Sequence, residues 1–132
     1  MKRPISSMMQ RKVWTADIDD SVESVERLLA DQGLSWVPVQ ESGGAIVGVV
    51  SAADLLQFHA HKRDAASVCA WQLCTYKPVA VAPDTDAGAV ARLMVARGIH
   101  HVVVVEQDVL LGVVSSLDFV RRFASEGGTG AS

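Results

Sequence analysis

The chain has 132 residues, which is enough for one domain with a compact core. Hydrophobic residues make up 49% of it and charged residues 20%, a composition typical of globular proteins. The formal net charge of −3 argues against nucleic acid as a partner, and no apolar run approaches the roughly 18–20 residues of a membrane-spanning helix. The start of the chain is basic but no apolar stretch follows it, so we expect no signal peptide and a cytoplasmic location.

The two cysteines, Cys69 and Cys74, are spaced like neither a redox motif nor a zinc site. No second cysteine pair is present to complete a metal site. We therefore expect buried free thiols, no metal and no cofactor.

The sequence contains an internal repeat. Residues 48–54 read GVVSAAD and residues 112–118 read GVVSSLD, so five of the seven are identical. The correspondence continues on the N-terminal side, where Gly33 aligns with Gly98 and residues 37–39 align with residues 102–104. A repeat of this length predicts two copies of one structural unit.

The first half of each copy is predicted to be a short strand followed by an amphipathic helix. The strands are expected over residues 13–16 and 79–82. Asp20 and Thr85 are expected to cap the two helices, whose apolar residues recur every three or four positions. Gly33 and Gly98 are expected to end them in a left-handed conformation.

The second half of each copy is predicted to be two buried strands and a helix that begins at the repeated serine. Continuous β-branched runs favour strands covered on both faces, over residues 36–39, 46–50, 102–105 and 110–114. The last helices are expected to present apolar faces made of Leu55, Leu56 and Phe58 in one copy and Phe119, Val120 and Phe123 in the other.

Each copy therefore reads β-α-β-β-α, and the predicted fold class is α+β with internal pseudo-twofold symmetry. We expect a single domain over residues 1–124, with repeat one at about 5–61, a linker at about 62–67, repeat two at about 68–124 and a flexible tail at 125–132.

Each predicted last helix begins with a serine and an aspartate three residues later, Ser51 with Asp54 and Ser115 with Asp118. One interpretation is purely structural, since a serine followed three residues later by an acidic residue caps a helix. The other interpretation is functional. A helix N-terminus and a hydroxyl suit a phosphate, and an aspartate one turn later suits the hydroxyls of a ribose.

These residues resemble a pair of CBS motifs, the tandem repeats of a CBS (Bateman) module. The resemblance also includes the run Gly98-Ile99-His100-His101-Val102-Val103-Val104. The resemblance covers about residues 5–124. It implies a stand-alone regulatory module, not an enzyme, that binds AMP, ADP, ATP or S-adenosylmethionine in two related clefts. It also implies a flat homodimer and an effector protein whose identity is unknown.

In such modules the aspartate holds the ribose, and the serine or threonine region meets the phosphate. The resemblance implies that one cleft uses Thr75, Val79, His100, Val102, Ser115 and Asp118, and that a second, weaker one uses Gln10, Trp14, Val37, Ser51 and Asp54. The Asp118 cleft ranks first because the second copy has Thr75 where the first has Gln10, and because Trp36 replaces His101 and would fill space in the other cleft.

His100 and His101 point to opposite faces of a strand, so they cannot easily share a metal, but one of them is a candidate ligand contact. The sequence has no P-loop, HExxH motif or G-x-S-x-G elbow, so nothing nominates an enzyme. The main alternative is an interaction or scaffolding module that binds no nucleotide and uses the Ser–Asp pairs only as helix caps.

Overall fold

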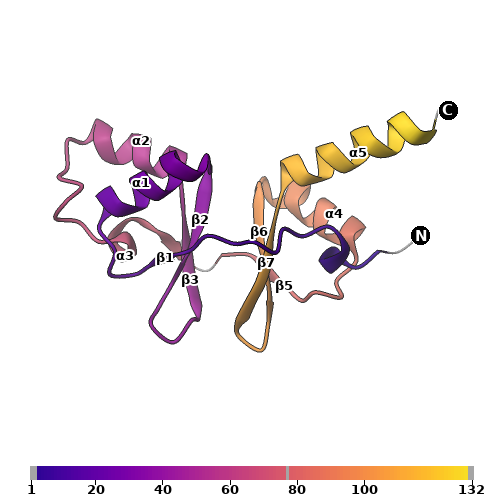
Figure 1. Cartoon of the computed structure of the whole chain (residues 1–132), viewed down its shortest axis with the longest axis horizontal. Coiled ribbons are helices and arrows are strands. Elements are labelled where there is room, and N and C mark those ends of the chain that lie inside the picture. Colours follow the sequence, from indigo (N-terminus) through magenta and orange to yellow (C-terminus); the bar gives the residue numbers. More distant parts are fainter. Residues whose placement is uncertain (1–2, 77, 131–132) are drawn as a thin grey trace. The chain divides into compact units, whose positions relative to one another are not determined.

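The structure is a computed structural model that describes residues 3–76 and 78–130 (Figure 1). It divides into two compact units, which we name after the aspartates they contain. The Asp54 unit is Trp14–Pro78, and the Asp118 unit is Met1–Val13 together with Val79–Ser132. Each unit combines a small sheet with helices, so the predicted α+β fold with two tandem β-α-β-β-α repeats is confirmed.

The Asp54 unit contains a four-stranded sheet in the order β1-β2-β3-β4. Its elements are β1 (Ala16–Asp17), α1 (Val22–Gln32), β2 (Trp36–Gln40), β3 (Ile46–Ser51), α2 (Ala52–Ala60), α3 (Ala70–Leu73) and β4 (Thr75–Tyr76). β1 is parallel to β2, whereas β3 is antiparallel to both β2 and β4. Val25, Val37, Val50 and Phe58 lie in its core, so the helices and the sheet share one buried cluster.

The Asp118 unit contains a three-stranded sheet in the order β5-β6-β7. Its elements are the 3-10 helix η1 (Ile5–Ser7), β5 (Ala80–Val81), α4 (Ala87–Arg97), β6 (His101–Glu106), β7 (Val109–Ser115) and α5 (Ser116–Gly130). β5 is parallel to β6, and β6 is antiparallel to β7. Ile5, Val90, Val104 and Val114 are among its core residues.

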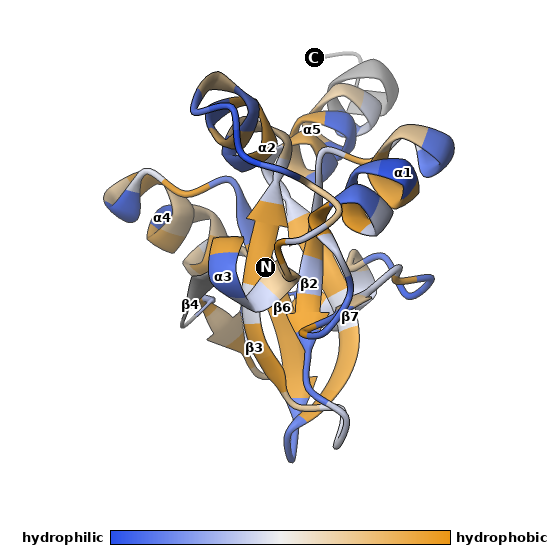
Figure 2. Cartoon of the chain, turned by 90° about the vertical axis from the view of Figure 1, so that its left-hand side faces the viewer, coloured by the Kyte–Doolittle hydropathy of each residue, from blue (hydrophilic) through white to orange (hydrophobic). Residues whose placement is uncertain are grey.

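The long strands are hydrophobic over most of their length, whereas the helices mix apolar and polar residues (Figure 2). Val102, Val103 and Val104 are consecutive in β6, and each is at most 1% exposed. Consecutive side chains on a strand face opposite sides, so both faces of β6 are covered here. The prediction drawn from the lack of alternation is confirmed for β2 and β6, whereas buried and partly buried residues alternate in β3 and β7.

The compact units do not coincide with the repeats predicted from the sequence. Residues 5–13 open repeat one, yet they belong to the Asp118 unit, where Ile5 N donates to Thr85 O at 2.7 Å and Gln10 pairs with Val113. The opening segment of repeat two belongs to the Asp54 unit, where β4 pairs with β3. Each opening segment pairs with an edge strand of the other repeat's sheet, so the two opening segments are exchanged between the repeats.

The caps of the two amphipathic helices, Ser21 and Asp86, each lie one residue after the predicted cap. Ser21 Oγ accepts a hydrogen bond from Ser24 N at 3.1 Å, and Asp86 Oδ2 accepts one from Ala89 N at 3.3 Å. Asp20, which was the predicted cap of α1, instead accepts a hydrogen bond from Asp17 N. The helices end as predicted, because Gly33 and Gly98 have φ values of 64° and 62°.

The end of the chain differs from the predicted flexible tail. Helix α5 runs over Ser116–Gly130, so it includes residues 125–130, and residues 131–132 lie outside the described part of the chain. Glu126 Oε1 accepts hydrogen bonds from Arg122 Nε and from Arg3 Nη1, both at 3.2 Å. These pairs extend the helix beyond the point where the apolar pattern stops.

Candidate functional site

The first candidate site lies where β3 ends and α2 begins. Asp54 Oδ2 accepts hydrogen bonds from Ser51 N at 2.8 Å and from Ser51 Oγ at 2.9 Å. Asp54 N donates in return to Ser51 Oγ at 3.3 Å. The arrangement is a capping box, and it fixes the Asp54 carboxylate at the positive end of the helix.

The second candidate site repeats this geometry between β7 and α5. Asp118 Oδ2 accepts a hydrogen bond from Ser115 N at 2.8 Å, and Asp118 N donates to Ser115 Oγ at 3.3 Å. The structural interpretation of both Ser–Asp pairs is therefore confirmed. A capping role does not prevent the same carboxylates from binding a ligand through their remaining lone pairs.

Gln10 distinguishes the Asp118 site. Its Nε2 donates to Asp118 Oδ1 at 2.8 Å, and its main chain exchanges hydrogen bonds of 2.8 and 3.0 Å with Val113. Gly112 permits this approach, since a Cβ at that position would lie 2.8 Å from Gln10 O. Both oxygens of Asp118 therefore already have partners, one from Ser115 and one from Gln10.

Asp54 lies in the wall of a cavity of about 300 Å³ within its own unit. The cavity is also lined by Gln57, Phe58, His61, Arg63 and Leu73. The guanidinium carbon of Arg63 lies 5.1 Å from the centre of the Phe58 ring, which is a cation–π arrangement. The cavity thus combines an acceptor for hydroxyl groups, an aromatic wall and a cation, at the lower end of the size range of small-molecule sites.

His101 is a second neighbour of Asp118. It pairs with Ser115 across β6 and β7 and is half-buried, whereas His100 is exposed. The pKa of His101 is lowered from 6.5 to about 4, mainly by burial and also by the nearby His100, while Asp118 acts in the opposite direction. The sequence pointed to this pair and selected His100. In the structure it is His101 that pairs with Ser115 and whose pKa the Asp118 carboxylate influences.

The other predicted site residues are distributed between the two units. Thr75 is in β4 and pairs with Val49, so it belongs with Asp54 and not with Asp118. Val37 and Val102 are buried in the two cores, and Val79 packs against the core of the Asp118 unit. Trp14 is 38% exposed and belongs to the Asp54 unit. Gln10 and Thr75 thus stand in the opposite groups to those predicted, because the opening segments are exchanged.

Within residues 3–76 and 78–130, no group of three or more His, Cys, Asp or Glu side chains is arranged to hold a metal ion. Over the same residues, no helix is both long enough and apolar enough to span a lipid bilayer.

Known proteins share this architecture. The family model described as CBS domain matches residues 5–61 and again residues 70–125. The uncharacterized protein MJ0188 of Methanocaldococcus jannaschii is 31% identical over 122 residues, which cover 92% of this chain and 44% of that protein. The chain spans less than half the length of the curated relatives that it matches.

Two solved structures show the same fold at low sequence identity. The CBS domain pair of protein MJ0100, in complex with 5′-methylthioadenosine and S-adenosyl-L-methionine, has a TM-score of 0.85 and 20% identity, and covers 96% of this chain and 99% of that one. CBSX2 in complex with AMP has a TM-score of 0.79 and 24% identity, and covers 92% and 96%. The chain belongs to the CBS domain family, and residues 5–61 and 70–125 are its two copies of that domain.

Proposed function

We propose that this chain is a regulatory module that binds an adenosine-containing ligand and transmits the occupied state to a partner protein. AMP, ADP, ATP and S-adenosylmethionine are the candidates. The observation that carries the proposal is the position of Asp54, which is fixed at a helix N-terminus and lines a cavity together with Arg63. The ligand class is supported by two proteins of the same fold, which were solved with S-adenosyl-L-methionine and with AMP.

The Asp54 cavity is the first choice in this proposal, in place of the Asp118 site that ranks first on sequence. Thr75 was one reason for ranking Asp118 first, and Thr75 belongs to the Asp54 unit. A ribose at Asp118 would have to share Oδ1 with the amide of Gln10, whereas Asp54 concentrates its two bonds from Ser51 on a single oxygen. Arg63 supplies a cation for the phosphate or carboxylate end of the ligand.

Binding would act on the partner through a change in populations. A ligand held by Asp54 and Arg63 would link the first turn of α2 to the segment that follows its last turn. The ligand would raise the population of conformations in which these two parts can hold it. The size of the shift would depend on how much more tightly the ligand binds those conformations than the others. A partner protein that recognises that arrangement would then sense the ligand.

The proposal includes a homodimer. The last helices were predicted to present apolar faces that include Leu56, Val120 and Phe123, and these side chains are 75%, 58% and 60% exposed. Leu56 and Val120 occupy equivalent positions of α2 and α5 in the two repeats. Exposed apolar residues at matching positions are suited to contact with a second copy of the chain.

The experiment is a thermal-shift and calorimetric titration with AMP, ADP, ATP and S-adenosylmethionine. A ligand at about 100 times its dissociation constant stabilises the folded state by roughly 2.7 kcal/mol. Asp54→Asn should remove most of this stabilisation, because the asparagine amide oxygen can still accept a hydrogen bond from Ser51 N but the residue no longer offers two carboxylate oxygens. Asp31→Asn is the matched control on an exposed residue of α1 and should leave the stabilisation unchanged.

Other results lead to other conclusions. If Asp118→Asn removes the stabilisation and Asp54→Asn does not, the Asp118 site is the ligand site, as the sequence predicted. If none of the four ligands changes the melting temperature, the nucleotide proposal fails. The alternative, an interaction module whose Ser–Asp pairs are only helix caps, then stands on the capping boxes already observed.

A further inference from the structure

We propose that the Asp118 unit carries a second ligand site, which binds a small organic acid with an apolar body. The site is a cavity of about 500 Å³ between η1, the first turns of α4 and the middle of α5. Its lining consists of Arg3, Met8, Asp86, Ala87, Gly88, Ala91, Arg92, Phe119, Arg122, Phe123 and Glu126. It does not include Ser115, Asp118 or any residue of the Asp54 cavity.

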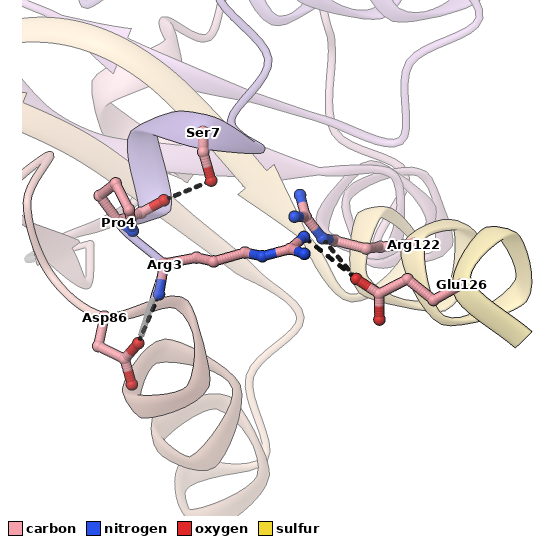
Figure 3. Close-up of polar contacts among 6 residues, drawn as sticks. All are labelled: Arg3, Pro4, Ser7, Asp86, Arg122 and Glu126. Carbon is pink, nitrogen blue, oxygen red and sulfur yellow. Dashed lines mark hydrogen bonds and ion pairs between the residues drawn. The ribbon is translucent and has the colours of Figure 1, made fainter. Parts of the chain in front are cut away.

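The anionic end of the ligand would take the position of the Glu126 carboxylate. Arg3 Nη1 and Arg122 Nε approach the same oxygen of Glu126, each at 3.2 Å (Figure 3). Two guanidinium groups that converge on one carboxylate oxygen form a receptor for a carboxylate or a phosphate. Glu126 is 53% exposed, so its side chain can turn into solvent when another anion arrives.

The remaining charges of the cavity are one cation, Arg92, and one anion, Asp86. Arg92 is the third cation, and its Nη2 lies 4.0 Å from Asp86 Oδ2. Asp86 is already occupied, since it caps α4 and accepts a hydrogen bond from Arg3 N at 3.2 Å (Figure 3). When the Glu126 side chain points into solvent, the cavity is lined by three arginines and one acidic side chain, and it therefore favours an anion.

The apolar body of the ligand would lie on aromatic and small side chains. The rings of Phe119 and Phe123 are 6.3 Å apart between centroids, and Phe123 is 60% exposed. Met8 lines the same cavity and adapts readily to the shape of a ligand. Free acetate or inorganic phosphate would use only the charged part, so an acid with a ring or an aliphatic chain should bind more tightly.

The other repeat shows that the charges of this cavity are a property of one copy and not of the fold. Where the Asp118 unit has Arg122, the Asp54 unit has Phe58, which is 2% exposed and belongs to the core. Where the Asp118 unit has Ala91 and Phe123, the Asp54 unit has Glu26 and His59, which pair with each other. In the Asp54 unit these positions border other cavities, since Phe58 lines the Asp54 cavity and Glu26 and His59 line one of about 370 Å³. What the Asp118 unit has in addition is the pair of arginines, Arg3 and Arg122, that converge on Glu126.

The test uses 2-naphthoate as the probe, titrated into the full chain by isothermal calorimetry. Arg122→Ala should weaken its binding about tenfold or more, since one charge-assisted contact is lost. Glu126→Gln should tighten binding about threefold, because the competing carboxylate is gone. Arg121→Ala is the matched control, since it removes the same charge from the adjacent residue outside the cavity and should change affinity less than about twofold.

Further variants and ligands test whether the probe binds through overall charge, through apolar contact alone or at the adenosine site. Arg3→Ala tests the second guanidinium at an exposed position near the chain's start, where no core side chain is removed, and it should also weaken binding. Acetate and 2-naphthalenemethanol should each bind more weakly than 2-naphthoate. Equal effects of Arg121→Ala and Arg122→Ala, weaker binding by Glu126→Gln, or displacement of the probe by AMP would each overturn the proposal.

Discussion

Gln10 Nε2 lies 2.8 Å from Asp118 Oδ1, although the two residues come from different repeats of the sequence. The contact exists because the opening segment of repeat one leaves its own repeat and pairs with β7. The candidate ligand carboxylate of repeat two is thus in contact with the start of repeat one. A change in the first ten residues can therefore affect a site at the beginning of the last helix.

The first prediction concerns this hydrogen bond. Gln10→Ala should lower the free energy of unfolding by less than about 1 kcal/mol, because Gln10 is exposed and water can replace its amide. A double-mutant cycle with Asp118→Asn, followed by urea denaturation, should give a coupling energy of a few tenths of a kcal/mol or more. A coupling energy of zero would mean that the contact does not form in solution.

The second prediction concerns Gly112, the glycine of the duplicated GVVS motif. A Cβ at this position would lie 2.8 Å from Gln10 O and 2.8 Å from Met9 Sδ. Gly112→Ala should therefore push the opening segment away from β7 and destabilise the protein by about 1–3 kcal/mol, the usual range for overpacking. Urea denaturation gives the loss of stability, and faster proteolysis between residues 5 and 13 would show that the segment has detached.

Gly43→Ala is the matched control for this change. Gly43 lies in the turn between β2 and β3, and a Cβ there would meet nothing within 4 Å. The substitution should change stability by less than about 0.5 kcal/mol. Equal losses of stability for Gly112→Ala and Gly43→Ala would show that the close approach of Gln10 does not depend on a glycine at position 112.

The elements of each repeat could be predicted from the sequence because their signals are local. The apolar run at 102–105 predicted a strand covered on both faces, and the consecutive residues Val102 and Val103 are both buried. Gly33 was expected to end its helix in a left-handed conformation, and its φ is 64°. Ser51 and Asp54 were expected to form a helix cap, and their mutual hydrogen bonds do so.

The candidate site was less predictable because it depends on which sheet each opening segment joins. The residues around Gln10 and Thr75 show that a segment is extended, but an edge strand can pair with either repeat. Pairing with Val113 and with Val49 decides the question: it brings Gln10 to Asp118 and places Thr75 in the sheet of the Asp54 unit. His101 was similarly ambiguous, since alternation along a strand predicts opposite faces for two histidines without saying which face meets Asp118.

The third prediction concerns acid sensitivity. Burial lowers the pKa of His101 to about 4, below its ordinary value of 6.5, so the folded state favours the neutral ring. The unfolded chain takes up a proton first as the pH falls. The stability that depends on a neutral His101 is therefore complete above about pH 6.5 and is lost progressively as the pH falls toward 4.

His101→Gln should make the stability less dependent on pH over this window. The free energies of unfolding from urea titrations at several pH values should fall less steeply for the variant than for the unmodified chain. His100→Gln is the control, since His100 is exposed and should leave most of the slope in place. Identical slopes for the unmodified chain and His101→Gln would rule out His101 as the group responsible.

The fourth prediction concerns the exposed apolar positions of the last helices. Leu56 and Val120 are 75% and 58% exposed, so an aspartate at either position leaves the fold of its own unit intact. If these faces form the proposed homodimer, Leu56→Asp and Val120→Asp should shift the chain from dimer to monomer in sedimentation velocity. Val109→Asp, on an exposed strand position, is the control and should leave the dimer in place. Dimers of unchanged stability in all three variants would locate the interface elsewhere.

The fifth prediction separates the two roles of the repeated serines. Ser51→Ala removes a cap from α2 and Ser115→Ala removes the matching cap from α5, so each should cost about 0.5–2 kcal/mol of stability. If the Asp54 cavity binds the adenosine ligand, Ser51→Ala should also weaken ligand binding, since its hydroxyl holds Oδ2 of Asp54 in place. Ser115→Ala should lose stability without losing that affinity. Calorimetry on both variants measures the difference, and equal losses of affinity would show that the ligand depends on both helix starts.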